Sequence, residues 1–361
     1  IDDGLISAKI KLGETYENYN DYEKAMIIFK EALNQSEKLG DKKNTAISIR
    51  KMGIIYYKKY DYNKALDYFT RSLELSELIN DKSLISMALN NIGVSYGRQY
   101  NKDKEIEYLT RSLKLAEEIG DKDKIAFVAI NIGDINLKKG DYDTALDYYS
   151  RSLKISEELG NKMRIGYALF NIGVLYETKG DYNKALDYYN LSLKIDEELG
   201  DKSSMAGSLF TIGNLYLTKC DYEKGLSYYE RTLEIYEEIG TKNEFGGVFL
   251  SYGFLYYKKG EYNMALDYYT RALEIYEEFD IKEDIPNLFA NIGLVYFQQE
   301  NYKQAVEYLE KSATMQMDFD NTVILETISH LFLSKKILGR EYNVTEIHTL
   351  IKEQKEIEDY I

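Results

Sequence analysis

The chain of 361 residues contains one proline, one cysteine and no tryptophan. So little proline leaves room for long, uninterrupted helices, and Pro286, which closely follows Asp284, suits the first turn of a helix. A single cysteine, Cys220, excludes a disulfide within the chain and is typical of a reducing compartment. We therefore expect a helical, cytoplasmic protein.

Long apolar runs and excess positive charge are also missing. No stretch approaches the roughly 18 apolar residues of a membrane-spanning helix, although 44% of the residues are hydrophobic. The 46 basic and 61 acidic residues give a net charge of −15, which opposes nucleic acid and anionic membrane surfaces. The sequence thus predicts no nucleic-acid partner and no membrane partner. Because the chain begins at Ile1 rather than at methionine, we interpret it as a segment excised from a longer protein.

The sequence has no recognisable catalytic or cofactor motif. It lacks a glycine-rich phosphate loop and a nucleophile with a plausible base. Its two histidines, His330 and His348, lie near no cysteine pair and no carboxylate cluster at metal-ligand spacing. We therefore predict no enzymatic activity, no cofactor and no metal site.

A period of 40 residues organises the chain. Three residues after each periodic glycine stands a tyrosine, except at Asn136. A fixed period of this length indicates stacked supersecondary units that bury their apolar faces on one another. The periodic glycines are Gly13, Gly53, Gly93, Gly133, Gly173, Gly213, Gly253 and Gly293.

Each unit is predicted to form two amphipathic helices. In one unit, apolar residues follow helical spacing over residues 162–178 and again over residues 182–198. Gly180 and Asp181 between them are typical of a helix C-cap followed by an N-cap. Gly173 costs about 1 kcal/mol relative to alanine inside a helix, and we attribute it to close approach of the small Ala185.

Five residues of this unit carry a family resemblance. Gly173, Tyr176, Ala185, Tyr189 and Ser192 lie at the spacing of the tetratricopeptide repeat. The chain resembles the 40-residue variant found in Pins-type adaptors and in microbial regulatory domains, but it lacks the usual early tryptophan and late proline. The resemblance implies an all-α, right-handed superhelical solenoid of antiparallel helix pairs.

We expect two segments. Residues 1–320 would form an array of eight repeats, and residues 321–361 a degenerate ninth repeat that caps the array. In this cap, residues 322–338 and 343–359 fit two helices around Gly339. The array itself is irregular where Glu105 replaces alanine and Asn136 replaces tyrosine. We expect a slightly loosened, hydrated junction there, with a polar pocket or a local change of superhelical twist as the alternatives.

The resemblance also implies an inner groove lined by the first helices. That stripe is rich here in aromatic and aliphatic side chains, which can bury one face of a peptide, and in asparagines, which can hold its backbone. Purely structural packing of the stripe is the alternative. The predicted groove residues are Phe127, Asn131, Tyr167, Phe170, Asn171, Val174, Phe210, Asn214, Leu250, Phe254 and Tyr257.

These features favour a protein-interaction scaffold that binds a peptide or helical segment of a protein partner. Gly207 and Gly247 would widen the groove and favour the fifth to seventh repeats. One alternative is a sensory or regulatory domain that controls an attached or partner signalling enzyme. Another is structural self-association through the ends of the array. The sequence does not identify the partner.

Overall fold

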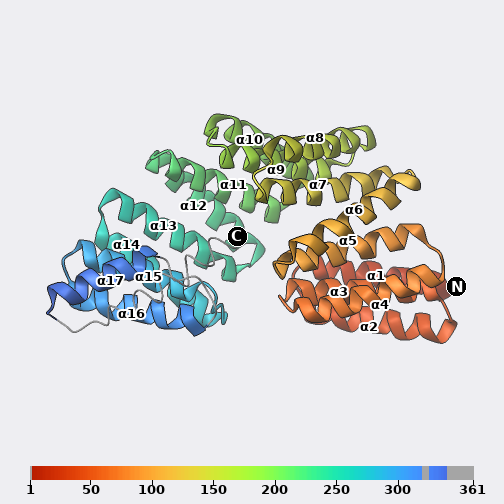
Figure 1. The fold of residues 1–361 in the computed structure, drawn as a ribbon, viewed down its shortest axis with the longest axis horizontal. Coiled ribbons are helices and arrows are strands. Elements are labelled where there is room, and N and C mark those ends of the chain that lie inside the picture. The colour runs from red at the N-terminus through yellow and green to blue at the C-terminus, as the bar shows by residue number, and fades with distance from the viewer. Residues whose placement is uncertain (1, 319–324, 340–361) are drawn as a thin grey trace. The chain divides into compact units, whose positions relative to one another are not determined.

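The computed structural model describes the backbone of residues 2–318 and 325–339. Within these residues it is an all-α solenoid of helix pairs, as predicted (Figure 1). The first helices of the pairs are α1 (Asp2–Asn18), α3 (Lys42–Lys58), α5 (Lys82–Arg98), α7 (Lys122–Lys138), α9 (Lys162–Thr178), α11 (Lys202–Thr218), α13 (Phe245–Lys259) and α15 (Ile285–Gln298).

The second helices are α2 (Tyr22–Leu39), α4 (Tyr62–Leu78), α6 (Lys102–Glu118), α8 (Tyr142–Leu159), α10 (Tyr182–Leu199), α12 (Tyr222–Ile239), α14 (Tyr262–Glu278) and α16 (Tyr302–Asp318). A 3₁₀ turn, η1 (Lys242–Glu244), precedes α13, and Pro286 lies in the first turn of α15, as predicted. The chain divides into two compact units, residues 1–195 and residues 196–361. Each unit is described by itself.

Local sequence sets where the helices begin and end. Gly180 adopts the left-handed φ of 77°, which ends α9, and a carboxylate oxygen of Asp181 accepts the Lys184 N–H at 3.3 Å. This bond satisfies one of the amides that the first turn of a helix leaves unpaired. The predicted C-cap and N-cap are thus confirmed in this repeat.

The periodic glycine makes room for a large side chain of the second helix. A Cβ atom added at Gly173 would lie 2.6 Å from the ring of Tyr189, which is fully buried. The ring of Tyr189 is thus the nearest neighbour of Gly173, and the predicted close approach at the Ala185 position is seen one repeat later, where a Cβ added at Gly225 would lie 3.4 Å from the Gly213 carbonyl oxygen. The contact of the periodic glycine with a large side chain recurs in all eight repeats, with an added Cβ 2.4 to 2.8 Å from Phe29, Phe69, Leu109, Tyr149, Tyr189, Tyr229, Tyr269 or Leu309.

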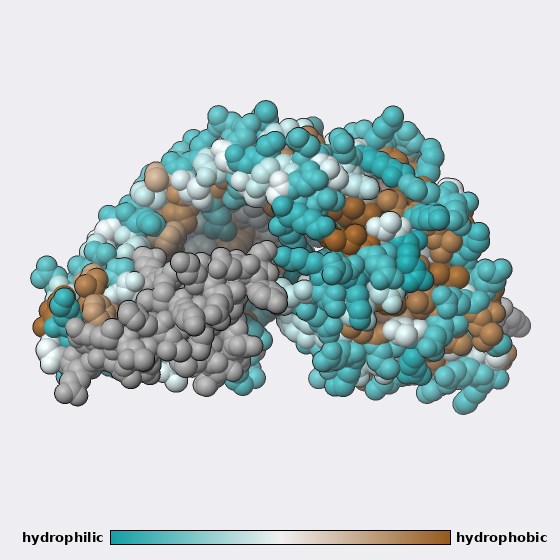
Figure 2. Space-filling view, in the orientation of Figure 1, coloured by the Kyte–Doolittle hydropathy of each residue, from teal (hydrophilic) through white to brown (hydrophobic). Residues whose placement is uncertain are grey.

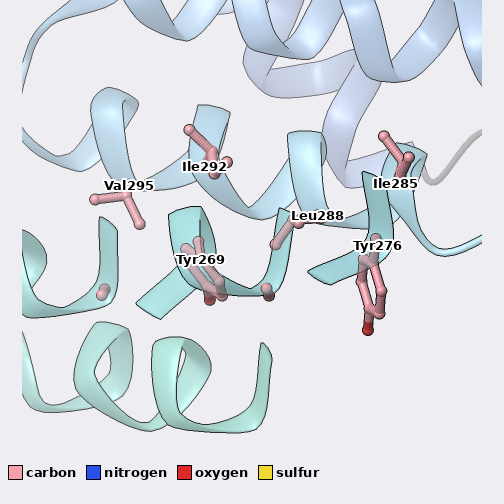
Figure 3. Packing of buried hydrophobic residues seen from close by; sticks show 8 residues of the cluster. Tyr269, Tyr276, Ile285, Leu288, Ile292 and Val295 are labelled. Atoms are coloured by element: carbon pink, nitrogen blue, oxygen red, sulfur yellow. The ribbon is translucent and has the colours of Figure 1, made fainter. Parts of the chain in front are cut away.

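The second helix also packs on the first helix of the next repeat. In the second unit, Tyr269 and Tyr276 of α14 lie against Leu288, Ile292 and Val295 of α15 (Figure 3). All five side chains are buried. Because each helix pair buries its apolar surface on its neighbour, the core extends along each unit rather than collecting at one centre.

In six of the eight repeats, the tyrosine three residues after the glycine stacks on a tyrosine of the second helix. Tyr176 and Tyr188 lie with ring centroids 5.5 Å apart and planes inclined by 8°. In the fourth repeat Asn136 replaces the first tyrosine, and its amide donates to the Ile132 carbonyl oxygen at 2.8 Å instead. The other stacks, at 5.1 to 5.7 Å, are Tyr56 with Tyr68, Tyr96 with Tyr108, Tyr216 with Tyr228, Tyr256 with Tyr268, and Tyr296 with Tyr308.

At the irregular junction, a large residue of α6, Glu105, lies against a residue of α5 that has no side chain, Gly97. Glu105, in the place of an alanine, is 8% exposed, and its carboxylate occupies the space that a side chain at Gly97 would need. Burial raises the pKa of Glu105, and the charge of Asp134 raises it further, whereas Lys138 lowers it. The carboxyl group of Glu105 thus fills the space beside Gly97, and the loosened or hydrated junction stays a prediction.

Beyond the eighth repeat, the structure describes α17 (Leu325–Ile337), in which His330 contacts the ring of Phe297 at a centroid distance of 4.7 Å. The predicted helix over residues 343–359 and His348 lie outside the described residues, so the cap stays a prediction. In the described ranges, no helix is both long enough and apolar enough to cross a membrane. Residues 2–318 and 325–339 also contain no cluster of potential metal ligands.

Candidate functional site

A cavity of about 470 Å³ lies in the first unit and is lined by residues of α5, α7 and α9. Its apolar lining comes from Met87, Phe127, Ile130, Met163 and Tyr167. In the orientation of Figure 2, hydrophobic surface shows between hydrophilic atoms over the region of α5 to α7. The volume is in the range that holds a small ligand or a few side chains of a peptide.

The repeat register explains why these residues meet. Met87, Phe127 and Tyr167 are 40 residues apart, so they occupy the same position on three consecutive first helices. The next two residues in this register are Gly207 and Gly247, where an added Cβ would have no atom within 4 Å. The row of large side chains at this position therefore ends at Tyr167, and the space beside Gly207 and Gly247 is open. That the wider groove favours the fifth to seventh repeats stays a prediction.

The apolar side chains at the mouth of the cavity are unusually accessible. Met163 is 57% exposed and Tyr167 is 52% exposed, although both project from the regular helix α9. Large apolar groups gathered at a cavity are typical of surfaces that a partner covers. Because both residues lie on α9, the hydrogen bonds of that helix hold the backbone of the site in place.

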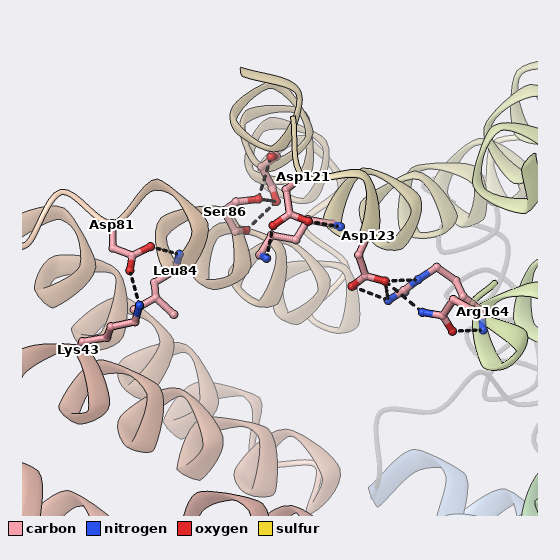
Figure 4. A network of polar contacts seen from close by, with 10 residues as sticks. Lys43, Asp81, Leu84, Ser86, Asp121, Asp123 and Arg164 are labelled. Carbon is pink, nitrogen blue, oxygen red and sulfur yellow. Dashed lines mark hydrogen bonds and ion pairs between the residues drawn. The ribbon is translucent and has the colours of Figure 1, made fainter. Parts of the chain in front are cut away.

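A charged pair forms one side of the cavity. The Arg164 guanidinium donates to Asp123 at 2.9 and 3.1 Å through Nη2, and Asn161 donates to the same carboxylate at 3.1 Å (Figure 4). The guanidinium also lies 5.1 Å from the centre of the Phe127 ring. Arg164 thus contacts both the carboxylate of Asp123 and the apolar ring of Phe127. The Asp123 side chain remains half exposed in this ion pair.

Asparagines follow the same register beside the cavity. Asn171 lines it, and Asn131 donates through Nδ2 to Oδ1 of the buried Asn90 at 2.7 Å. Asn91, one repeat before Asn131, has a buried Nδ2 with no hydrogen-bond acceptor. The asparagines of this stripe therefore differ in how much hydrogen-bonding capacity remains for a ligand.

Of the groove residues predicted in the first unit, three line the cavity: Phe127, Tyr167 and Asn171. Asn131 lies one repeat before Asn171 and donates to Asn90. Phe170 is half-buried and packs on the Tyr189 ring at a centroid distance of 5.1 Å. Val174 is also half-buried. The cavity thus gathers part of the predicted stripe, and Phe170 belongs to the packing of the helix pair.

The predicted residues of the second unit make contacts within that unit. Phe210 packs on Tyr229 at 5.9 Å, and Asn214 accepts the Tyr229 hydroxyl at 2.7 Å. Leu250 packs against the apolar cluster of α14 and α15. Phe254 is 36% exposed, with the Lys258 ammonium 4.9 Å from its ring centre and Tyr257 at 6.4 Å.

Sequence reasoning missed the polar side of the cavity. The polar residues Asp123, Lys124, Asn161 and Arg164, and beside them the apolar Met163, lie near the beginnings of α7 and α9 and were not predicted as site residues. A signal was present, because Arg164 is one turn before Tyr167 and therefore on the same helix face. Which ion pair Asp123 would form was not readable from spacing.

Comparison with protein families gives one match. The model of the tetratricopeptide repeat matches residues 4–78, 44–118, 124–198, 204–278 and 247–318. A comparison with curated proteins finds no match.

Several solved structures share the fold at low sequence identity. The Signal Transduction ATPase with Numerous Domains from Pyrococcus horikoshii, described with a tetratricopeptide repeat sensor, is 17% identical with a TM-score of 0.67, and the match covers 94% of this chain and 55% of that one. A Rap protein complexed with Competence and Sporulation Factor is 14% identical with a TM-score of 0.61, over 87% of this chain and 98% of that one. Aspartyl phosphate phosphatase F from Bacillus subtilis is 12% identical with a TM-score of 0.58, over 86% and 94%. At these identities the likeness extends to the fold alone.

Proposed function

The chain belongs to the tetratricopeptide repeat family, and we propose that it is a protein-interaction scaffold that holds a segment of a protein partner against α5, α7 and α9. An apolar side chain of that segment would enter the cavity of the first unit. The observation that carries this proposal is the row of Met87, Phe127 and Tyr167 at the cavity.

Burial of the exposed apolar side chains supplies the binding energy in this proposal. Covering the accessible parts of Met163 and Tyr167 removes apolar surface from water at about 25 cal/mol per Å². An anchor side chain of the partner that fills the cavity adds a contact of the kind that contributes about 2 kcal/mol or more. Because the receiving helices are already folded, the ordering cost of binding falls on the partner segment rather than on this chain.

The polar groups at the cavity suit the backbone of a peptide. Asn171 can both donate and accept, and the half-exposed Asp123 offers a further acceptor at the cavity. Arg164 keeps that carboxylate in place and covers one face of Phe127. These groups would orient a segment whose affinity comes from the apolar anchor. The net charge of −15 disfavours nucleic acid as the occupant.

A regulatory role is the second candidate. Of the structures with this fold, one is described as the sensor of a signal transduction ATPase and another as a complex with Competence and Sporulation Factor. In a regulatory role, the same cavity would hold the controlling peptide, and an attached or partner signalling enzyme would respond. Assaying the activity of a signalling enzyme that co-purifies with the chain, with and without the bound segment, would separate this role from simple scaffolding.

The test is selection of a displayed library of random peptides on the folded chain, repeated on two variants. Tyr167→Ser removes an exposed side chain at the cavity, and Tyr19→Ser removes one that is 80% exposed at the α1–α2 turn. We expect peptides selected on the wild type to lose binding to Tyr167→Ser and keep it to Tyr19→Ser. Peptides that bind all three proteins alike would contradict the proposed site.

A further inference from the structure

Two tyrosines occupy a strained place in the turns of the second and third repeats. Tyr60 and Tyr100 have φ angles of 61° and 59°, in the left-handed region that bulky side chains rarely adopt. Their side chains are 76% and 87% exposed, so packing within the fold does little to offset the strain. The other six repeats have no aromatic ring at this place, where they have Asn20, Gly140, Gly180, Cys220, Gly260 and Glu300.

The two tyrosines belong to a cluster that we call the tyrosine patch: Tyr57, Tyr60, Tyr62, Arg98 and Tyr100. Nε of Arg98 donates to the Tyr57 hydroxyl at 2.9 Å. The Tyr62 ring has its centroid 5.5 Å from that of Tyr57 and 6.4 Å from that of Tyr60. Burial raises the pKa of Tyr62, Arg98 lowers it, and the hydroxyls of the other three tyrosines raise it. All of these groups therefore lie near the Tyr62 hydroxyl.

Contacts between two repeats hold the patch in shape. Besides the bond from Arg98 to Tyr57, the side-chain amide of Gln99 donates to Asn63 at 2.7 Å, so the turn after α3 is tied to the turn after α5. Arg98 is exposed and has no ion pair and no other hydrogen bond among the residues that the structure describes. Its terminal nitrogens Nη1 and Nη2 therefore keep their donors for a ligand.

Local charge separates these two turns from the rest of the array. Residues 56–64 contain three lysines and one aspartate, and residues 96–104 contain one arginine, two lysines and one aspartate. Each turn thus carries a net charge of +2, whereas the same nine positions of the other six repeats carry between −2 and +1. In a chain with a net charge of −15, the two adjacent turns form a local positive surface.

We infer that the tyrosine patch is a second interaction surface, formed by the turns of the second and third repeats, and that it binds an acidic segment of a protein partner. Acidic side chains of the segment complement the two positive turns, and its apolar groups cover the rings of Tyr60 and Tyr100. Tyrosine and arginine are enriched among the residues that dominate binding energy. Tyrosine rings also supply contact area at a low cost in conformational entropy.

This surface is separate from the cavity and does not rest on the proposed function. The cavity uses α5 through Met87, whereas Arg98 is the last residue of that helix, about three turns further on. The patch also consists of exposed side chains on turns, whereas the row of Met87, Phe127 and Tyr167 lies on the bodies of first helices. A partner can therefore contact the patch while the cavity is empty or filled.

A nucleic acid strand fits the patch less well than an acidic protein segment. Aromatic rings beside basic groups can also stack bases. An extended polyanion, however, would pass from the patch to the neighbouring turns, where residues 16–24 carry a net charge of −2 and residues 136–144 are neutral. Continued binding would be opposed there, whereas a short acidic segment needs only the two positive turns.

The first test compares stability in variants that remove the strain. Tyr60→Gly combined with Tyr100→Gly places in both turns the residue found there in three other repeats, and glycine adopts the left-handed φ without strain. We expect Tm to be no lower than that of the wild type. A clear fall in Tm would mean that the rings support the turns and would overturn the inference.

The second test selects a displayed library of random peptides on Tyr167→Ser, so that peptides held by the cavity are disfavoured. We expect enrichment of peptides with clustered aspartate or glutamate beside an apolar residue. These peptides should bind at least tenfold more weakly when the two glycine substitutions, or Arg98→Gln, are added. Glutamine is a mild replacement here, since Gln298 in the same register donates to the Tyr257 hydroxyl at 3.5 Å.

Lys38→Gln is the matched control, because it removes one positive charge from an exposed lysine in the last turn of α2. It should leave the affinity of the selected peptides unchanged. Selected peptides without an acidic excess, or peptides indifferent to the patch substitutions, would overturn the inference and leave the cavity proposal standing. Tighter binding of a short single-stranded oligothymidylate at the patch would also overturn it. Failure of the cavity as a site would not affect this test.

Discussion

Asp196 should destabilise the folded chain at neutral pH and cease to do so in acid. It lies in α10, is 7% exposed, and accepts the Ser208 hydroxyl at 3.0 Å. Three earlier repeats have serine in this register. Burial raises the pKa of Asp196 to about 6 from 3.8, with smaller upward contributions from Asp201 and Glu197 and an opposing one from the Ser208 hydrogen bond.

The upward direction of this pKa shift determines how the free energy of unfolding depends on pH. A carboxyl group with a raised pKa binds its proton more tightly in the folded state, so ionisation at neutral pH lowers the free energy of unfolding. A shift of about two units corresponds to about 3 kcal/mol at most. This cost is full above pH 6, declines as pH falls through 6, and is absent below the unfolded pKa of about 4.

Urea unfolding of wild type and Asp196→Ser at pH 7.5 and pH 4 measures this cost. We expect the variant to be more stable by about 1 to 3 kcal/mol at pH 7.5, and this advantage to disappear at pH 4. Asp143→Ser is the control, since the Asp143 side chain is 98% exposed. An advantage of Asp196→Ser that is equal at both pH values would refute the reasoning.

Substitutions at Gly173, Asn136, Glu105 and Gly97 test the helix-pair packing by chemical denaturation. Gly173→Ala should cost about 1 to 3 kcal/mol, because the added methyl enters the ring packed on it. Asn136→Tyr should gain about 0.5 to 1.5 kcal/mol, because it offers Tyr148 the missing stacking partner. Glu105→Ala alone should gain little, because it leaves a void beside Gly97, whereas the double variant Glu105→Ala with Gly97→Leu should be the more stable of the two.

Three results would contradict these expectations. A neutral Gly173→Ala would mean that the ring shifts without strain. No gain from Asn136→Tyr would mean that the hydrogen bond to Ile132 is worth as much as the stack. Additive effects at Glu105 and Gly97 would mean that the two residues do not share one space.

Local patterns in the sequence were sufficient to predict the helix pairs. Period, apolar spacing and residues such as Gly180 and Asp181 act within one or two turns, so helices and caps could be placed in advance. The contact across each pair was not predictable in the same way. Whether Gly173 faces Ala185 or the ring of Tyr189 depends on how two helices rotate about their axes, which spacing along one helix does not specify.

The sequence predicts which residues share one face of the first helices, but not which of them line the cavity. Phe127 and Phe170 both follow the register of the first helix, yet Phe127 lines the cavity and Phe170 packs on Tyr189. For Phe170 and Phe210 we therefore expect truncation to lower stability as well as any binding, with Tyr189→Ala costing about 3 to 5 kcal/mol as the reference for a fully buried ring.

Affinity at the cavity tests the central claim most directly. A peptide selected on the wild type is titrated into wild type, Tyr167→Ser and Tyr19→Ser, with Tm measured for each protein. We predict at least a tenfold loss of affinity for Tyr167→Ser, equivalent to about 1.4 kcal/mol, with Tm close to that of the wild type and no loss for Tyr19→Ser. Equal affinity of the peptide for all three proteins would contradict a binding site on α5, α7 and α9.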